Sequence, residues 1–185
     1  PMDKATIYGA KIGEAGIEEC IDSIRNHPNA KVELGPNQGR GIAIGYWGNA
    51  GGESSSQLYI NEDGTAVVIT GHPDIGGSRA SMVNIVAEKL GIDYRNVKAQ
   101  IGDTNTVGIS AVTGGSRVTF AAGIVVDEAT DQVINTLKAR AAGIWGIDVE
   151  AVEWRDGAAY PASPNAGDFE PLTLPELAKK AVATG

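Results

Sequence analysis

Apolar residues recur three or four positions apart in several stretches of the chain, which is the period of an amphipathic helix. Residues 16–26 carry one such stripe, and the spacing places Cys20 on its buried side. Residues 79–90 carry a second stripe, which Gly91 ends. Residues 116–142 form the longest helical stretch. Its first half, VTFAAGIVV, is apolar nearly all round, so we expect it to be buried, while its second half turns charged residues outward.

Short runs rich in apolar or β-branched residues predict strands. The turn Asn-Glu-Asp-Gly at residues 61–64 joins two of them into a hairpin, and Asp156-Gly157 turns a second hairpin. Thr173 and Glu176 have the spacing of a capping box that begins a terminal helix. The expected strands are residues 41–47, 56–60, 65–70, 97–101, 149–155 and 158–160. The order of these elements predicts an α+β fold, with helices packed on a mixed, largely antiparallel sheet.

The domain organisation follows from a change in composition near residue 38. Residues 28–39 are rich in Pro, Asn and Gly, which is typical of a loop. We therefore expect a lead-in with one short helix at residues 1–38 and a partial α+β domain at residues 39–185. A chain of 185 residues suits one domain with a small appendage. Because it opens as if continuing from earlier sequence, we expect a fragment or one subunit of a larger protein.

Composition narrows the possible partners. The formal net charge is −8 and the basic residues do not cluster, which argues against a nucleic-acid or anionic membrane partner. A single cysteine cannot form an internal disulfide, a zinc-finger ligand set or an iron–sulfur cluster. Neither a long apolar run nor a signal peptide is visible, so a cytoplasmic location is expected. The 25 glycines are not periodic and lie between apolar runs, which is typical of turns and of backbone close to a ligand.

Two glycine loops stand out because each leads into a predicted helix. The first, residues 71–78, ends in Gly76, Gly77 and Ser78, and the second, residues 112–117, contains Gly114, Gly115 and Ser116. The N–H groups at a helix N-terminus bind anions, and the neighbouring Arg79 and Arg117 have the geometry to clamp a phosphate. The alternative is that the serines cap helices and the glycines make turns. The residues alone leave both interpretations open.

Other chemistry has less support. Neither loop has the Gly-Lys-Ser/Thr ending of a nucleoside triphosphate loop or a dinucleotide-binding glycine pattern. His27 lies in a polar loop and His72 precedes a proline, so neither is a strong candidate for a catalytic triad. Solvated turn or cap carboxylates explain Glu53, Asp74 and Asp103, although Asp74 lies inside the first loop. No metal site is expected from the spacing of these acids.

Residues 65–126 resemble the molybdenum-cofactor-binding subunit of the xanthine dehydrogenase/aldehyde oxidase family. The segments that carry the resemblance follow one another at matching spacing. They are Asp74-Ile75-Gly76-Gly77, the helix end VAEKLG at residues 86–91, Asp103-Thr104-Asn105-Thr106 and Thr113-Gly114-Gly115-Ser116-Arg117. Residues 39–47 and 172–182 agree more loosely.

The resemblance implies a function and a cofactor. Such enzymes hydroxylate aldehydes or electron-poor heterocycles with oxygen from water at a molybdopterin (molybdenum) cofactor, which we expect in the full complex. Whether this chain alone retains the cofactor stays open. The implied partners are the remaining part of the molybdenum subunit, an iron–sulfur subunit and often an FAD subunit. The implied cofactor-binding residues are Asp74, Gly76, Gly77, Ser78, Thr113, Gly114, Gly115, Ser116 and Arg117.

The chain also departs from the family pattern. Gly77 stands where many members have a glutamine beside the molybdenum ligands, and the C-terminal GxGE segment with the catalytic glutamate is absent. No catalytic residue is therefore expected in this chain, which should not be active alone. Two alternatives remain: a non-catalytic module of the same fold that binds a phosphate-bearing ligand or a partner, and an independent hydrolase or transferase.

Overall fold

The computed structural model describes residues 16–45, 47–49, 51–163 and 166–180. Contacts divide the chain into two units, Pro1–Gly45 and Tyr46–Gly185. The lead-in over residues 1–15 lies outside the described residues, and the boundary expected after residue 38 stays a prediction. No helix in the described ranges is long and apolar enough to cross a membrane.

The first unit contains the predicted short helix, α1 (Ile17–Asn26), followed by a 3₁₀ turn, η1 (Pro28–Lys31). Two expectations are wrong here. None of the residues of α1 is buried, and Cys20 is exposed. The predicted strand at 41–47 is absent from its described residues, which run without a strand partner. A strand pattern needs a neighbouring edge for its backbone hydrogen bonds, and the described part of this unit supplies none.

The second unit begins with a mixed three-stranded sheet in the order β1-β2-β3. The predicted hairpin is confirmed, since β1 (Ser56–Ile60) pairs antiparallel with β2 (Ala66–Thr70). β3 (Val97–Ile101) pairs parallel with β2. The crossover between these parallel strands is α2 (Ser78–Leu90), which ends at Gly91 in the left-handed conformation, and the 3₁₀ turn η2 (Tyr94–Asn96).

A second, antiparallel sheet has the order β4-β5-β6. A 3₁₀ turn, η4 (Val149–Ala151), leads into β4 (Val152–Arg155), which forms the predicted hairpin with β5 (Ala158–Pro161). The short β6 (Leu172–Thr173) joins α4 (Leu174–Lys179). The predicted capping box is confirmed, because Thr173 N donates to Glu176 Oε2 at 2.8 Å. The α+β class is confirmed, with two small sheets where one was expected.

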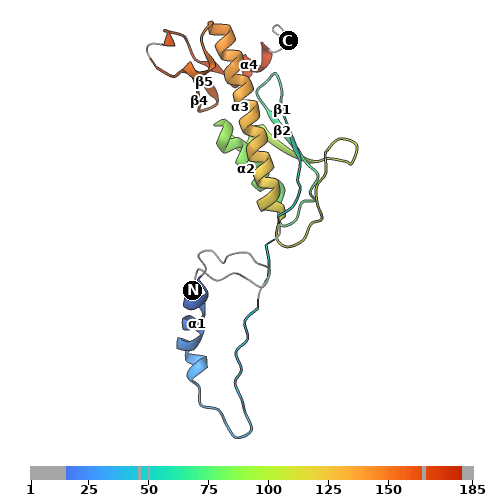
Figure 1. Cartoon of the computed structure of the whole chain (residues 1–185), viewed down its shortest axis with the longest axis vertical. Helices are drawn as coiled ribbons and strands as arrows, with labels where there is room; N and C mark the ends of the chain where they lie inside the picture. The colour runs from blue at the N-terminus through green and yellow to red at the C-terminus, as the bar shows by residue number, and fades with distance from the viewer. Residues whose placement is uncertain (1–15, 46, 50, 164–165, 181–185) are drawn as a thin grey trace. The chain divides into compact units, whose positions relative to one another are not determined.

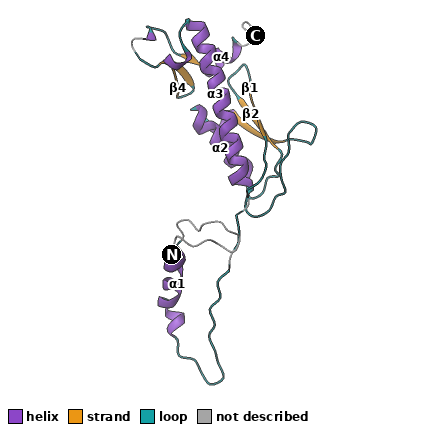
Figure 2. Ribbon diagram, viewed as in Figure 1, coloured by secondary structure: helices purple, strands orange, loops and turns teal. Residues whose placement is uncertain are grey.

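The longest helix, α3 (Gly123–Trp145), follows a π-helical turn, η3 (Val118–Ala122). It packs against α2 and β1 and, further along, against β4 and α4 (Figure 1). Figure 2 shows the purple helices of this unit beside its orange strands. The expectation that the stretch 118–126 is buried all round is wrong at three positions: Thr119 is exposed, Phe120 is 55% exposed and Ile124 is 46% exposed. An apolar stretch does not reveal which of its faces has a neighbour.

The core of this unit consists of two clusters joined by shared side chains. One lies between the first sheet, α2 and the start of α3, and the other between the end of α3, the second sheet and α4. The side chains that pack against both are Ile60, Ile92, Val133 and Trp154. The Trp154 indole also donates to the Leu90 carbonyl at 3.1 Å. Gly91 approaches the β4–β5 turn so closely that a Cβ there would lie 2.7 Å from Gly157 N, which explains the need for glycine at this position.

Candidate functional site

The first glycine loop connects β2 to α2. Gly76 and Gly77 have φ angles of +62° and +81°, a region that favours glycine. A Cβ at either position would meet no atom within 4 Å, so the backbone here faces open space. Among the described residues, no hydrogen-bond acceptor faces the N–H groups of these two glycines. The loop therefore presents two free backbone donors just before a helix.

The charge at this helix N-terminus is already balanced inside the loop. Asp74 Oδ1 accepts the N–H of Arg79 at 3.0 Å, and Arg79 Nε lies 2.9 Å from Asp74 Oδ2. These hydrogen bonds, first from the Arg79 backbone and then from its side chain, lower the pKa of Asp74. Ser78 does not cap the helix, and its hydroxyl donates to the Pro73 carbonyl at 3.4 Å. The capping role expected for Ser78 therefore belongs to Asp74, and the expected phosphate clamp, Arg79, is paired with it.

The second glycine loop leads into the π-helical turn η3. Gly115 and Ser116 have φ angles of +63° and +56°, and the position beside Gly114 is open, with no atom within 4 Å of a built Cβ. Asn49 Nδ2 holds the loop by donating to the Ser116 carbonyl at 3.0 Å. Within the described part of the chain, no acceptor pairs with the N–H groups of residues 113–116. Consecutive free N–H groups of this kind form an anion-binding concavity.

Arg117, at the end of this loop, is only 2% exposed. Its guanidinium turns into the protein and donates five hydrogen bonds of 2.6–3.0 Å, to the carbonyl oxygens of Gly51, Gly52, Glu53 and Ala111 and to Ser54 Oγ. No carboxylate among the described residues pairs with it. The side chain holds two neighbouring segments in place, and its geometry differs from the bidentate phosphate clamp that the sequence suggested.

His72, at the start of the first loop, is connected to the same cluster. It is 3% exposed, and its Nε2 lies 3.1 Å from Ser54 Oγ, which also accepts from Arg117. Burial and, second, the charge of Arg117 lower the pKa of His72. Ser54 thus joins the beginning of one glycine loop to the end of the other. The sequence does not predict this link, since its only local signal is a run of serines before a strand.

A hollow of about 450 Å³ lies where the parallel strands β2 and β3 end. It is lined by Gly71, Gly102, Thr104, Val107, Gly108, Ile109 and Ser110. The carboxyl ends of parallel strands are the usual place for ligands in such sheets. Asp103 Oδ1 accepts the N–H of Asn105 at 2.8 Å, which confirms the interpretation of this acid as a turn carboxylate. In the described ranges, no three acidic, His or Cys side chains are grouped as metal ligands.

Comparison with known proteins connects this geometry to one family. The family model described as the molybdopterin cofactor-binding domain matches residues 21–185. Aldehyde oxidase 1 of Macaca fascicularis is 29% identical over 51% of this chain and 7% of its own length. The aldehyde oxidoreductase molybdenum-binding subunit PaoC of Escherichia coli (strain K12) is 33% identical over 42% of this chain and 10% of its own length. The chain thus spans about a tenth or less of these curated relatives.

Solved structures share the fold. The Cu,Mo-CO dehydrogenase has a TM-score of 0.61 and 24% identity, over 69% of this chain and 16% of its own. Quinoline 2-oxidoreductase from Pseudomonas putida 86 has a TM-score of 0.59 and 23% identity, over 70% of this chain and 16% of its own. At these identities the likeness establishes the fold alone.

Proposed function

The chain belongs to the molybdopterin cofactor-binding domain family, and from this we propose that it forms part of the cofactor-binding subunit of a molybdenum hydroxylase. The reaction proposed for the complete enzyme is hydroxylation of an aldehyde or a heterocycle with oxygen from water. The names of the curated relatives, an aldehyde oxidase and an aldehyde oxidoreductase molybdenum-binding subunit, support this reaction class. The chain's own part is to supply cofactor-binding loops.

The observation that carries the proposal is the row of free N–H groups at residues 113–116, beside the open backbone at Gly114. A molybdopterin cofactor bears a phosphate, and free backbone donors without a side chain in front of them fit such an anion. When bound, the cofactor supplies the redox centre for hydroxylation. The loop residues supply the hydrogen bonds that hold and orient it.

Each predicted site residue has a place in this proposal. Thr113, Gly114, Gly115 and Ser116 donate backbone hydrogen bonds to the phosphate or the pterin. Gly76 and Gly77 offer the open edge of the first loop to the rest of the cofactor, where glycine instead of glutamine leaves room near the metal. Asp74 and Ser78 fix that loop from within through their hydrogen bonds to Arg79 and Pro73.

Arg117 has a positioning role. It is a buried cation balanced by carbonyl dipoles, and among the described residues no carboxylate is paired with it. Its charge therefore extends to the adjoining loop and favours an anion there, because a buried charge is weakly screened. We propose that it shapes the second loop and adds to its positive potential without touching the phosphate.

The alternatives have less support. A non-catalytic phosphate-binding module of the same fold is not favoured, because the family match and both curated relatives point to molybdenum hydroxylases. An independent hydrolase or transferase needs a general base near the loops. The nearest histidine, His72, is buried and already paired with Ser54.

The complete enzyme is proposed to contain further chains or segments. They are the remaining part of the molybdenum subunit, an iron–sulfur subunit and an FAD subunit, in a cytoplasmic complex. Residues 39–185 are proposed as the cofactor-binding portion of this chain.

The test is the molybdenum and pterin content of the native complex purified through this chain. We expect both in the wild type, and at least a tenfold loss with Gly114→Val. Gly115→Val should lose them as well, but its positive φ adds strain that Gly114→Val avoids. Gly143→Val is the matched control, since its Cβ also meets open space, on α3. Full cofactor occupancy in Gly114→Val, or an active complex without molybdenum and pterin, would overturn the proposal.

A further inference from the structure

The first unit exposes a continuous apolar surface that its own described residues do not cover. Ile17 and Ile24 of α1 are 48% and 51% exposed, and Ile42 and Ile44 of the extended segment are 68% and 74% exposed. Together with Ile21 they line one hollow of about 510 Å³, which we name the isoleucine groove. An apolar surface of this kind on a short helix and an extended segment marks an interaction site.

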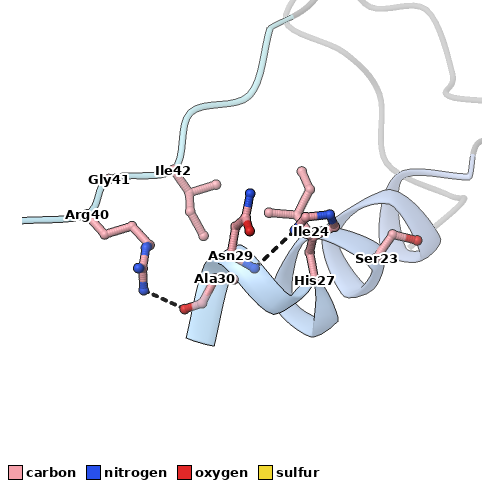
Figure 3. Close-up of a pocket in the computed structure, with 8 residues that line it drawn as sticks. All are labelled: Ser23, Ile24, His27, Asn29, Ala30, Arg40, Gly41 and Ile42. Carbon is pink, nitrogen blue, oxygen red and sulfur yellow. Dashed lines mark hydrogen bonds between the residues drawn. The ribbon is translucent and has the colours of Figure 1, made fainter. Parts of the chain in front are cut away.

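The spacing of these residues shows why they share one face. Along α1 the isoleucines recur at three or four positions, and along the extended segment they recur at two, so each element directs one side toward the groove. A second hollow of about 440 Å³ shares Ile24 and Ile42 with the groove, and Figure 3 shows the residues that line it.

Hydrogen bonds, and not apolar packing, hold the groove in shape. Arg40 donates from Nη1 to the Ala30 carbonyl (Figure 3) and from Nη2 to the Val32 carbonyl at 2.8 Å. His27 accepts the N–H of Asn29, which closes the turn after α1. The extended segment is thereby tied to the 3₁₀ turn that follows the helix, while the isoleucines of the groove stay exposed. A helix of ten residues is marginal in water unless its apolar face is covered.

We propose that the isoleucine groove is the docking surface for the remaining part of the molybdenum-binding polypeptide. This inference rests on the proposed function. The family match begins at residue 21, within α1, so the groove residues from Ile21 onward belong to the matched domain, although nothing described within the unit buries them. The chain spans only 7% and 10% of its curated relatives, so in those proteins the matched segment is accompanied by much further polypeptide.

The extended segment indicates how the partner binds. Residues 41–45 are extended and lie outside any sheet, so their backbone groups offer an edge to which a strand can add. An apolar strand of the molybdenum-binding polypeptide at that edge would place alternate side chains in the groove. A second copy of this chain is a poorer occupant, because two chains of net charge −8 repel one another.

Cys20 allows the groove to be probed chemically without introducing a new cysteine. It is the only cysteine in the sequence, it is exposed, and it lines the groove. We expect iodoacetamide to alkylate Cys20 at least tenfold more slowly in the native complex than in the isolated chain. A cysteine-anchored photocrosslinker should join Cys20 to a peptide of a molybdopterin-binding polypeptide. Cys20→Ser is the control for labelling at other sites.

A pair of variants separates docking from folding. Ile24→Asp should reduce the yield of the complex at least tenfold, while circular dichroism of the isolated chain stays unchanged, since Ile24 is already half exposed. Asn26→Asp adds the same charge to the same helix outside the groove and should leave the yield unchanged.

The molybdenum and pterin content of the same preparation distinguishes the two proposals. If both are present but Cys20 is alkylated equally fast in complex and isolated chain, the docking surface is wrong and the proposed function stands. A cross-link to a second copy, or to a protein that does not bind molybdopterin, also overturns the docking proposal. Absence of molybdenum and pterin from the active complex contradicts the proposed function itself.

Discussion

The two glycine loops look equivalent in the sequence and differ in the structure. In the first, the helix N-terminus is satisfied by the carboxylate of Asp74, which also binds the guanidinium of Arg79 at the surface. In the second, the arginine turns inward to the loop carbonyls and the backbone donors of residues 113–116 stay free. The first loop is thus nearly neutral within itself, whereas the second keeps its capacity for an external anion.

This difference shows that a glycine pair and an arginine before a helix do not define an anion site. The decisive feature is whether a carboxylate of the same loop already occupies the donors. In the first loop Asp74 accepts the Arg79 N–H and pairs with its guanidinium, so that only the N–H groups of Gly76 and Gly77 stay free, and no described acid binds the donors of the second loop. The second loop is therefore the stronger candidate for binding phosphate, and the first for lining the cofactor through its open glycines.

The largest expected effect is a difference in the free energy of unfolding between variants of Arg117 and Arg79. Arg117→Met leaves the carbonyls of Gly51, Gly52 and Ala111 without their donor, and should lower the free energy of unfolding by about 3 kcal/mol or more. Arg79→Met removes only a surface ion pair and should cost less than about 1 kcal/mol. Urea unfolding of both variants measures the two costs. Equal costs would show that Arg117 does not hold the loops together.

A smaller difference in stability is expected between variants of Gly76 and Gly114. Gly76→Ala forces a side chain into a left-handed backbone at φ +62° and should cost about 1 kcal/mol. Gly114→Ala meets open space without a positive φ, and should be neutral or stabilising by a few tenths of a kcal/mol, since alanine restricts the unfolded chain. Thermal unfolding at neutral pH checks both. A destabilised Gly114→Ala would indicate a contact that the structure does not contain.

The link between the loops should depend on pH through His72. Its pKa in the folded chain is below the ordinary value of 6.5, so the unfolded chain binds the proton more readily. The stability that depends on neutral His72 is complete above about pH 6.5 and is lost as the pH falls toward the lowered pKa. Unfolding free energies at pH 7.5 and pH 5 should differ less in His72→Gln than in the wild type.

The smallest effect concerns the internal neutralisation of the first loop. The pKa of Asp74 lies below its ordinary value of 3.8, so its contribution to stability is complete above that pH and is lost as the pH falls through the lowered value. Asp74→Asn should therefore show a weaker acid dependence of unfolding between pH 5 and pH 2. An unchanged profile would mean that Asp74 does not balance the charge of this loop.

Much of the fold was predictable because local signals agree with long-range packing. The hairpin turn after Ile60, the stop at Gly91 and the capping box at Thr173 and Glu176 each require specific residues at specific positions, and all are present in the structure. The parallel pairing of β2 and β3 was not visible, since strand patterns do not state direction.

The failures share a physical cause. Cys20 and the segment 41–47 have the patterns of a buried stripe and a strand, but burial and pairing depend on a neighbour that the described chain lacks. The capping role of Asp74 and the inward turn of Arg117 were equally invisible. They depend on which donors and acceptors lie close in space, and the partners of Arg117 in residues 51–54 are more than 60 positions away.

The Trp154 ring, which packs against both core clusters and is hydrogen-bonded to the Leu90 carbonyl, has a consequence for spectroscopy and cooperativity. Loosening either cluster would admit water to this one indole, so its emission would shift to longer wavelength whichever cluster opened. Since α3 and the four shared side chains couple the two clusters, we expect them to melt in a single transition. Trp154, in the second sheet, would then report on the integrity of the first sheet, whose parallel strands β2 and β3 end at the candidate site.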